Sequence, residues 1–509
     1  MRKLSNVWLL AVACLFYLVP ITSNFYAVTA WVAPIVLLMY FYKEKAKRAA
    51  PLALGSLSIV MAIAYYGVMP GGLGLVLVTM LVSVAMLIVL LLVNKWVVDR
   101  IGHVASVVFF PLLMTGYEYF SSYGSAFGTF NSSAYSQLDI RPIAMLASVS
   151  GIWGIVFIQY LVVSALAYAF KSGFRHGFRH HRRLWISTLT VVSLLVGAGA
   201  ILSSGVEEPS RTVKASGITP DRVLWDDTVL SLIERWGTPG FYDGLTRGPA
   251  GLEQIRQLNE SMLGRTKEEL ERGSRLIGWS EGAAIVMEHE EGEFRQRLQS
   301  LSGEFEAVLI AGYLKVNAQD GQKMDNKLVV VDVDGTIKAD YSKYSLVAGE
   351  ERYFNKGEEV VPVVETALGT IAVAICFDAD FPHRIREAGI GNPNILILPS
   401  SDWKAISPYH TEISAFRAIE NHMSVLRVTH AGMSAAYDAK GRQVGQMNDW
   451  DNEHGTVISV ELPLPGGKHT PYKTLGDLLP ILAGAAALMI LAVLVVRVII
   501  GRMLLGLKK

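Results

Sequence analysis

Three side chains that could together carry out acyl transfer each follow a predicted β-strand. Glu281 follows RLIGWS, Lys343 follows the hairpin KLVVVDVDGTIKADYS, and Cys376 ends TIAVAIC. Because α/β proteins bind their ligands beyond the strand ends, we expect these side chains to lie close together. A thiolate would be the nucleophile, and a nearby base or cation is needed to generate it. The three positions therefore predict a cysteine-dependent acyl-transfer site.

Each of these residues also has an ordinary structural explanation when it is considered alone. A cysteine at the end of a buried strand commonly fills a core, and a glutamate or lysine after a strand is commonly solvated. Their occurrence in this order, each after a strand, is much less expected by chance. The other cysteine, Cys14, lies in a distant apolar run, so we predict that Cys376 is a free thiol.

The region around these residues has the pattern of an α/β domain. Between about residues 207 and 470, short apolar runs typical of buried strands alternate with helical patterns that carry Glu and Arg. The Asp-Gly pair in the hairpin before Lys343 predicts some antiparallel pairing.

Four other polar residues of this domain are interpreted as structural. Arg417 and Glu420 are three positions apart on a predicted helix, so we expect them to pair with each other. His410 and His430 are expected near the rim of the cleft, as structural histidines rather than as groups that support the site.

The rest of the chain is too apolar for a water-soluble protein. Of its 509 residues, 51% are hydrophobic and 18% are charged, and the mean hydropathy is +0.35. Soluble domains carry about 25% charged residues. We predict a helical transmembrane domain of about seven spans in residues 1–206, the α/β domain in 207–470, and an eighth span within 471–509. The apolar runs lie at about 5–20, 25–42, 51–69, 71–94, 104–122, 145–170, 184–204 and 478–500.

Basic residues in the short loops predict the orientation of these spans. They all fall on one side if seven spans precede the α/β domain and one follows it. Because Lys and Arg gather in cytoplasmic loops, the α/β domain is expected on the opposite, extracytoplasmic face. The net charge of +1 gives no reason to expect a nucleic-acid partner. The basic residues concerned are Lys43, Lys45, Lys47, Arg48, Lys95, Arg100, Lys171, Arg175, Arg179, Arg182, Arg183, Arg502, Lys508 and Lys509.

Three motifs resemble those of the nitrilase superfamily of carbon–nitrogen hydrolases. WSEGA, YSKYSLVAGEE and CFDADFP occur in the order of its Glu–Lys–Cys triad, which implies an αββα sandwich. A nitrilase-like domain between a seventh and an eighth membrane span resembles the apolipoprotein N-acyltransferase family in particular. That resemblance covers nearly the whole chain.

The resemblance implies a two-step reaction with no metal and no organic cofactor. Glu281 would take the thiol proton, and Cys376 would attack a phospholipid ester to form a thioester. Lys343 and the backbone N–H of Phe377 would stabilise the oxyanion. The amino group of a diacylglyceryl-cysteine lipoprotein would then accept the acyl chain. The implied location is the bacterial cytoplasmic membrane, with several spans.

Three residues are expected at the substrate entrance. Glu118 in the fifth span and Gln137 in the segment after it fall where that family has a Glu and a Gln near its membrane-facing entrance. Trp403, which follows the predicted strand NILILPSSD, could line the acyl pocket or pack at its rim. Glu118 could equally be an interfacial residue bonded to a neighbouring helix.

Two departures from the family pattern leave alternatives open. The nucleophile motif is Cys376-Phe377-Asp378 where the family usually has Cys-Tyr-Glu, and an aspartate is common in soluble amidases. A membrane-anchored amidase with the same triad is therefore the alternative function. A non-catalytic membrane receptor or scaffold with this fold is the third hypothesis. The LVAGEE stretch is one residue short before its glycine. Glu350 or Glu351 could orient Lys343, and we favour Glu350, which directly follows the glycine.

Overall fold

The computed structural model describes residues 6–69, 72–101, 107–125, 127–171, 182–204, 211–235, 249–317 and 323–506. The chain divides into two compact units. Unit 1 comprises Met1–Ser125, Asn131–Gly205 and Leu475–Lys509, and unit 2 comprises Ala126–Phe130 and Val206–Thr474. The expected boundary at 206/207 lies outside the described residues.

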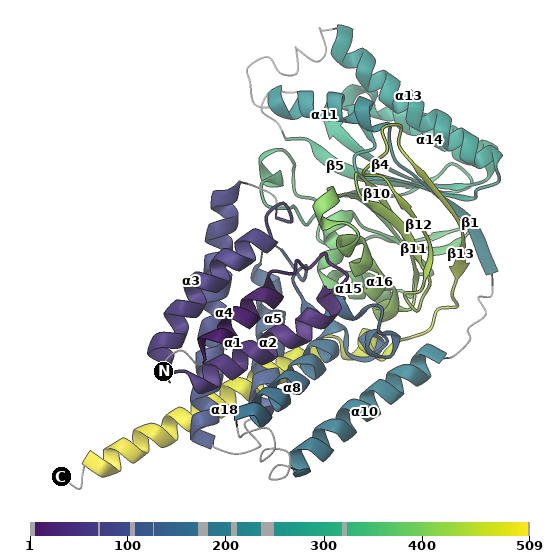
Figure 1. Ribbon diagram of the computed structural model, residues 1–509. Coiled ribbons are helices and arrows are strands. Elements are labelled where there is room, and N and C mark those ends of the chain that lie inside the picture. Colours follow the sequence, from purple (N-terminus) through teal and green to yellow (C-terminus); the bar gives the residue numbers. More distant parts are fainter. Residues whose placement is uncertain are drawn as a thin grey trace. The chain divides into compact units, whose positions relative to one another are not determined.

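Unit 1 is a bundle of apolar helices (Figure 1). Six of the described helices are long and apolar enough to cross a membrane, whereas the sequence predicted eight spans. The difference lies in α1 and α5, which have 11 and 16 residues, because a helix that crosses a bilayer needs about 20. The helices are α1 (Val7–Tyr17), α2 (Tyr26–Lys43), α3 (Ala46–Ala64), α4 (Leu73–Ile101), α5 (Phe109–Gly124), α6 (Arg141–Ala144), α7 (Ala147–Ser150), α8 (Ile152–Lys171), α10 (Arg182–Ser204) and α18 (Leu478–Gly506), with the 3-10 helix η2 (Ser133–Gln137).

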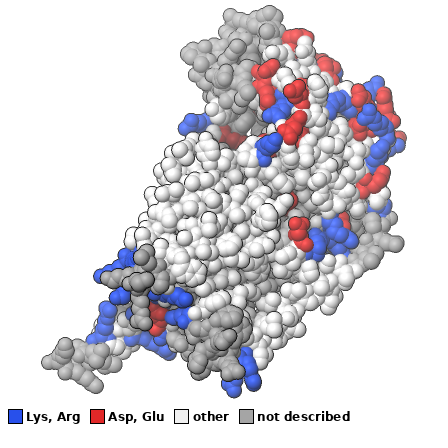
Figure 2. Space-filling view, in the orientation of Figure 1, with Lys and Arg blue, Asp and Glu red and all other residues white. Residues whose placement is uncertain are grey.

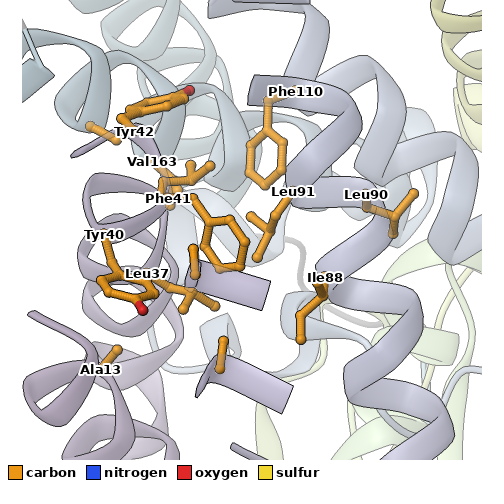
Figure 3. Packing of buried hydrophobic residues seen from close by; sticks show 14 of the residues in the cluster. Ala13, Leu37, Tyr40, Phe41, Tyr42, Ile88, Leu90, Leu91, Phe110 and Val163 are labelled. Atoms are coloured by element: carbon orange, nitrogen blue, oxygen red, sulfur yellow. The ribbon is translucent and has the colours of Figure 1, made fainter. Parts of the chain in front are cut away.

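The core of unit 1 lies between helices that are distant in the sequence. Phe41 of α2, Leu91 of α4, Phe110 of α5 and Val163 of α8 pack together (Figure 3). Their side chains are fully or almost fully buried although the helices are apolar on most sides. A helix that is apolar all round belongs in a bilayer or a large core.

Basic side chains gather at one end of unit 1, and the flank of the helices is nearly free of charge on the face in Figure 2. At that end the carboxylate of Asp99 on α4 lies 2.8 Å from Nζ of Lys171 on α8 and 3.5 Å from Nζ of Lys95. Lys95 also donates to the carbonyl of Tyr42 on α2. The ends of α2, α4 and α8 that carry predicted cytoplasmic charges therefore lie together.

The last helix of the chain packs tightly on α5. A Cβ added to Gly116 of α5 would stand 2.6 Å from Cα of Gly484 on α18, so the two backbones meet through paired glycines. Just before α18, Asp477 accepts hydrogen bonds from Nε1 of Trp153 at 3.1 Å and from the hydroxyl of Tyr123 at 3.4 Å. The start of α18 is thus fixed to α8 and α5.

Unit 2 is an αββα sandwich, as predicted (Figure 1). One sheet has the order β13-β1-β2-β4-β5-β6, with β3 beside β4, and the other has the order β12-β11-β10-β9-β8-β7. Helices α13 and α14 cover the first sheet, and α15 and α16 cover the second. Apolar residues from both sheets, such as Ile310 and Val428, form the core between them.

The strands of the first sheet are β1 (Arg211–Ile218), β2 (Leu276–Trp279), β3 (Ala284–Met287), β4 (Val308–Val316), β5 (Asp325–Val331), β6 (Ile337–Ser342) and β13 (Val457–Leu464). Those of the second are β7 (Val363–Thr366), β8 (Gly369–Val373), β9 (Ile395–Ser401), β10 (Ser424–His430), β11 (Met433–Tyr437) and β12 (Gln443–Asn448). The helices are α11 (Arg222–Arg235), α13 (Pro249–Glu271), α14 (Glu291–Phe305), α15 (Pro382–Ile390), α16 (Tyr409–Asn421) and α17 (Pro471–Leu475). The 3-10 turns are η3 (Glu288–Glu290), η4 (Glu350–Arg352), η5 (Cys376–Asp380) and η6 (Lys404–Ile406).

Two local predictions for this unit are confirmed. The Asp-Gly hairpin joins β5 and β6, which pair antiparallel, and Gly335 has a φ of +78° that favours glycine. Arg417 and Glu420 form an ion pair on α16, with 3.2 Å between Nε and Oε2, and both side chains are fully buried.

A short segment between helices of unit 1 belongs to unit 2. The backbone N–H and the hydroxyl of Thr129 both donate to the carbonyl of Asp380, at 2.9 and 2.7 Å. The carbonyl of Phe130 accepts a hydrogen bond from the hydroxyl of Tyr409 at 2.7 Å. This segment, Phe127–Phe130, is therefore bonded to the turn that carries Cys376 and to the start of α16.

Candidate active site

The residues predicted to form the site come from both sheets of the sandwich. Glu281 follows β2 and Lys343 follows β6, both in the first sheet. Cys376 follows β8 of the second sheet and begins the 3-10 turn η5. The layered fold brings the ends of β2 and β6 together, and the charges of Glu281 and Lys343 both act on Cys376 at the end of β8.

Glu281 and Lys343 form a buried ion pair. Nζ of Lys343 lies 2.8 Å from Oε1 of Glu281, and the two side chains are only 1% and 6% exposed. Glu281 also accepts a hydrogen bond at 2.7 Å from Nδ2 of Asn326 on β5. Burial works against the lysine charge, but Glu281 and Glu350 outweigh it and raise the pKa of Lys343 well above its usual value. Lys343 is therefore an ammonium, suited to stabilise negative charge rather than to take a proton.

Glu350, and not Glu351, is the second carboxylate on Lys343. Its two oxygens lie 3.0 and 2.9 Å from Nζ of Lys343, and one also accepts from the backbone N–H of Val347. Gly349 has a φ of +101° and turns the chain into η4, so that the side chains of Glu350 and Glu351 have different partners. Glu351 accepts a hydrogen bond from the backbone N–H of Gly349 instead.

Replacing Glu350 with glutamine should slow acyl transfer about 10- to 100-fold. A charge-assisted hydrogen bond to Lys343 is worth about 1.5–3 kcal/mol, and its loss leaves the ammonium less firmly oriented. The Glu351→Gln variant is the matched control, since it removes a neighbouring carboxylate that does not contact Lys343, and it should retain the wild-type rate. Initial rates with saturating lipid substrates would test this. Equal rates for the two variants would contradict the role of Glu350.

Cys376 has the geometry of a constrained nucleophile. It is a buried non-glycine residue with a φ of +47°, a conformation that side chains rarely adopt and that is common at functional sites. Its thiol donates to the carbonyl of Ser401 at 3.8 Å. Burial and then the charge of Glu281 raise the pKa of Cys376 well above its usual value, while Lys343 and Arg427 lower it. The resting group is thus a thiol that needs a base at the moment of attack.

Asp378 stabilises the turn that carries Cys376. Its carboxylate accepts hydrogen bonds from the hydroxyl of Tyr341 at 2.8 Å and from the backbone N–H groups of Ser345 and Ile375 at 2.8 and 3.1 Å. It is fully buried, and burial raises its pKa despite these hydrogen bonds. Asp378 therefore joins the Cys376 turn to the loop of Lys343. Phe377 is buried in the same turn, directly after the nucleophile.

The three residues expected at the substrate entrance are divided between the two units. In unit 1, Glu118 accepts a hydrogen bond from Ser132 at 2.9 Å. Gln137 is fully buried, and its amide bonds to Nε1 of Trp31 and to the carbonyl of Ala27. In unit 2, Trp403 is half-buried directly before η6. Entrance roles for these residues stay predictions, and the bonds of Gln137 are those of a structural residue.

Several polar residues at the site were not predicted to act there. Asn326 bonds to Glu281, while Asp402, His410 and Arg427 lie beside Cys376. Asp402 could have been found because it follows β9 in the way that Glu281 follows β2. Arg427 is inside a strand that reads as an ordinary buried strand, so nothing in the sequence singled it out.

Two family models match this chain. The model of the carbon–nitrogen hydrolases matches residues 249–472, and the model of the apolipoprotein N-acyltransferase N-terminal domain matches residues 6–165. The first contains the three candidate catalytic residues, and the second contains most of unit 1. The chain belongs to the apolipoprotein N-acyltransferase family. The family predicted from the motifs is thereby confirmed.

Similar proteins in other bacteria carry the name apolipoprotein N-acyltransferase. The one from Photobacterium profundum is 25% identical over 374 residues, 67% of this chain and 64% of its own length. Those from Geobacter metallireducens and Vibrio cholerae are each 23% identical, covering 85% and 87% of this chain and 83% and 88% of their own lengths. Among solved structures, an amidase from Nesterenkonia sp. covers 52% of this chain and 95% of its own, with 16% identity and a TM-score of 0.38.

Proposed function

We propose that this protein transfers an acyl chain from a membrane phospholipid to the N-terminal amino group of a diacylglyceryl-cysteine lipoprotein. The observation that carries the proposal is the buried Glu281–Lys343 ion pair beside the Cys376 thiol, in a chain that also contains a bundle of long apolar helices. Membership of the apolipoprotein N-acyltransferase family supports the same reaction.

The first step forms a thioester on Cys376. Glu281 takes the proton of the thiol, and the sulfur attacks the carbonyl carbon of a phospholipid ester. Lys343 and the backbone N–H of Phe377 stabilise the oxyanion. When this intermediate collapses, the ester C–O bond breaks, and the proton held by Glu281 passes to the leaving lysophospholipid oxygen. Because the pKa of the resting Cys376 thiol is raised, little thiolate is present before the reaction. Glu281 must therefore take the proton as the sulfur attacks.

The second step releases the acyl chain as an amide. The α-amino group of the lipoprotein attacks the thioester carbon, and Glu281 accepts a proton from the nitrogen. The C–S bond then breaks, and Glu281 returns that proton to the sulfur, which restores the Cys376 thiol and the Glu281 carboxylate. An α-amino group has a pKa of about 7.7–8.0, so a useful fraction is already unprotonated at neutral pH. The ammonium of Lys343 serves both steps because each passes through an oxyanion.

The membrane helices serve this reaction because both substrates are lipids. Extracting an acyl chain into water costs about 0.8 kcal/mol per CH₂, so a site on a membrane protein avoids a large barrier. We place the protein in the bacterial cytoplasmic membrane with the catalytic unit on the extracytoplasmic face, on the basis of the basic loops. No nucleic acid, metal or organic cofactor enters this scheme.

The test uses the purified full-length protein in detergent. Phospholipid alone should yield an enzyme heavier by one acyl chain, because a closed apolar site protects the thioester from water. Adding a diacylated lipopeptide with a free α-amino group should remove that mass and yield a triacylated lipopeptide. The alternative, a membrane-anchored amidase, would leave phospholipid untouched and cleave a small amide through Cys376, and that result would overturn the proposal.

The feature that favoured the amidase no longer does so. Asp378 was the residue shared with soluble amidases, but its carboxylate is occupied by Tyr341 and two backbone N–H groups. It acts on the shape of the turn and not on the choice between water and an amine.

A further inference from the structure

A buried network of charged side chains lies beside Cys376. Oδ1 of Asp402, just after β9, lies 2.7 Å from Nδ1 of His410 and accepts a hydrogen bond from Nη2 of Arg427 at 3.2 Å. On the other side of the imidazole, Nε2 of His410 lies 3.2 Å from Oδ2 of Asp380, the last residue of η5. The side chains of all four residues are at most 5% exposed.

This network lies next to the nucleophile. The sulfur of Cys376, a ring nitrogen of His410 and a carboxylate oxygen of Asp402 all lie within 4.8 Å of one another. The thiol donates to the carbonyl of Ser401, the residue before Asp402. The charge of Arg427 lowers the pKa of Cys376, and that of Asp402 raises it. The network therefore influences both the position and the ionisation of the sulfur.

A sulfur, an imidazole and a carboxylate at such distances could suggest a metal site. Here a guanidinium occupies the position that a metal ion would need. Nη2 of Arg427 lies 2.9 Å from Nδ1 of His410 and 3.2 Å from Oδ1 of Asp402. Among the described residues, Nε and Nη1 of this buried guanidinium have no hydrogen-bond partner. The cation of this cluster is thus an arginine that is held through a single nitrogen, Nη2.

The segment Phe127–Phe130 closes the network from one side. The ring of Phe130 packs edge-on against the ring of His410, with 5.7 Å between their centroids, and Thr129 bonds to the carbonyl of Asp380. His410 is therefore surrounded by Asp402, Asp380, Arg427, the Cys376 sulfur and an uncharged ring. Such a histidine has little freedom to move.

We propose that Arg427 and His410 are positioning residues for Cys376. They fix the Ser401–Asp402 segment that holds the thiol, and they supply positive charge that stabilises the thiolate as it forms. This inference rests on the proposed function in that it takes Cys376 as the nucleophile. In this arrangement Lys343 serves the substrate oxyanion, whereas Arg427 and His410 serve the sulfur.

The ionisation states agree with the geometry. Burial opposes charge on His410, but Asp402 and Asp380 outweigh it and raise the pKa of His410 to about 9. Burial also opposes charge on Asp402, but His410 and Arg427 lower its pKa to about 2. Because the pKa of folded His410 is raised, its stabilising effect is complete below about 6.5 and is lost as pH rises through about 9.

The test measures how fast iodoacetamide alkylates Cys376 as a function of pH. The full-length protein with Cys14→Ser is used, so that Cys376 is its sole cysteine. Arg427→Gln removes a positive charge next to the sulfur and should move the midpoint upward by about one pH unit. His410 carries its charge only below about pH 9, so His410→Gln should lower the alkylation rate below that pH rather than move the midpoint. Arg427→Lys keeps the charge and should give a midpoint close to that of the wild type. It also keeps the test open if Arg427→Gln does not fold.

Arg417→Gln is the matched control. Arg417 is likewise fully buried and paired with a carboxylate in unit 2, but that carboxylate is Glu420 on the same helix and not a group beside Cys376. This variant should lower the melting temperature and leave the alkylation midpoint unchanged. If Arg427→Gln and His410→Gln also lower only the melting temperature, the network is merely structural and the inference is wrong.

The same experiment separates this inference from the proposed function. Alkylation needs no lipid substrate, so its midpoint reports on the network alone. If the midpoint and the rate change as expected while phospholipid fails to acylate the wild-type protein, the proposed function falls and the role of Arg427 and His410 stands.

Discussion

The Cys376→Ser variant should form no acyl-enzyme and should lose triacylation activity by roughly 10⁴-fold or more, as expected when a nucleophile is removed. A serine hydroxyl is a far weaker acid than a thiol, and Glu281 and Lys343 are arranged around a sulfur atom. Intact-mass measurement after incubation with phospholipid would show the missing adduct, and triacylated lipopeptide would be quantified in the same samples.

The second cysteine supplies the control for this experiment. Cys14 lies on α1 in unit 1, so Cys14→Ser removes a thiol without touching the site. This variant should gain one acyl chain at the wild-type rate. Triacylation by Cys376→Ser, or loss of the adduct in Cys14→Ser, would show that the thioester forms elsewhere or not at all.

Replacing Lys343 with methionine should lower the acylation rate by about 10²- to 10³-fold, since one donor to the oxyanion is lost. The change also leaves Glu281 and Glu350 facing each other with no cation between them. Breaking a buried ion pair in this way costs about 3–5 kcal/mol of folding stability. Single-turnover acylation and thermal unfolding would measure the two effects.

The pH dependence of this variant gives a sharper test. The ammonium of Lys343 lowers the pKa of Glu350, so its removal should let the carboxylate pair bind a proton at a higher pH, which disables the site until that proton is lost. The acidic limb of the residual activity should therefore move upward. In the wild-type protein the pKa of Lys343 is raised, so its pairing contributes throughout the neutral range and is lost only at strongly alkaline pH.

Lys327→Met is the matched control for Lys343→Met. Lys327 lies on β5 in the same sheet, and its ammonium is 2.9 Å from Asp340 and 3.5 Å from Glu291, at a more exposed position. Its loss should leave the acylation rate and the acidic limb unchanged. A similar fall in rate for both variants would mean that the effect of Lys343 is on folding and not on the oxyanion.

The strand-end residues could be predicted from the sequence, but Arg427 and the way in which His410 and Asp402 join it beside Cys376 could not. Glu281, Lys343 and Cys376 each follow a recognisable strand, and the fold brings such ends together. Arg427 and His410 lie within an ordinary strand and an ordinary helix. Their importance comes from burial and from partners on other elements, which only tertiary structure supplies.

Two other features show where sequence patterns reach their limit. Glu350 and Glu351 are adjacent and chemically identical, and only the turn after Gly349 decides which one reaches Lys343. The apolar runs of α1 and α5 have the composition of membrane spans, but composition does not say where a helix ends. Hydropathy therefore predicted more full-length spans than the described helices provide.

The contact between Gly116 and Gly484 has a consequence for the order in which the chain assembles. These residues are separated in the sequence by the whole catalytic unit, yet their helices belong to the same bundle. During synthesis α5 emerges early, and its partner α18 emerges only after unit 2 is complete. Because contacts that are distant in sequence form late, the bundle closes last. Until then the face of α5 around Gly116 lacks the helix that packs on it, and the interval lasts at least as long as the translation of the catalytic unit.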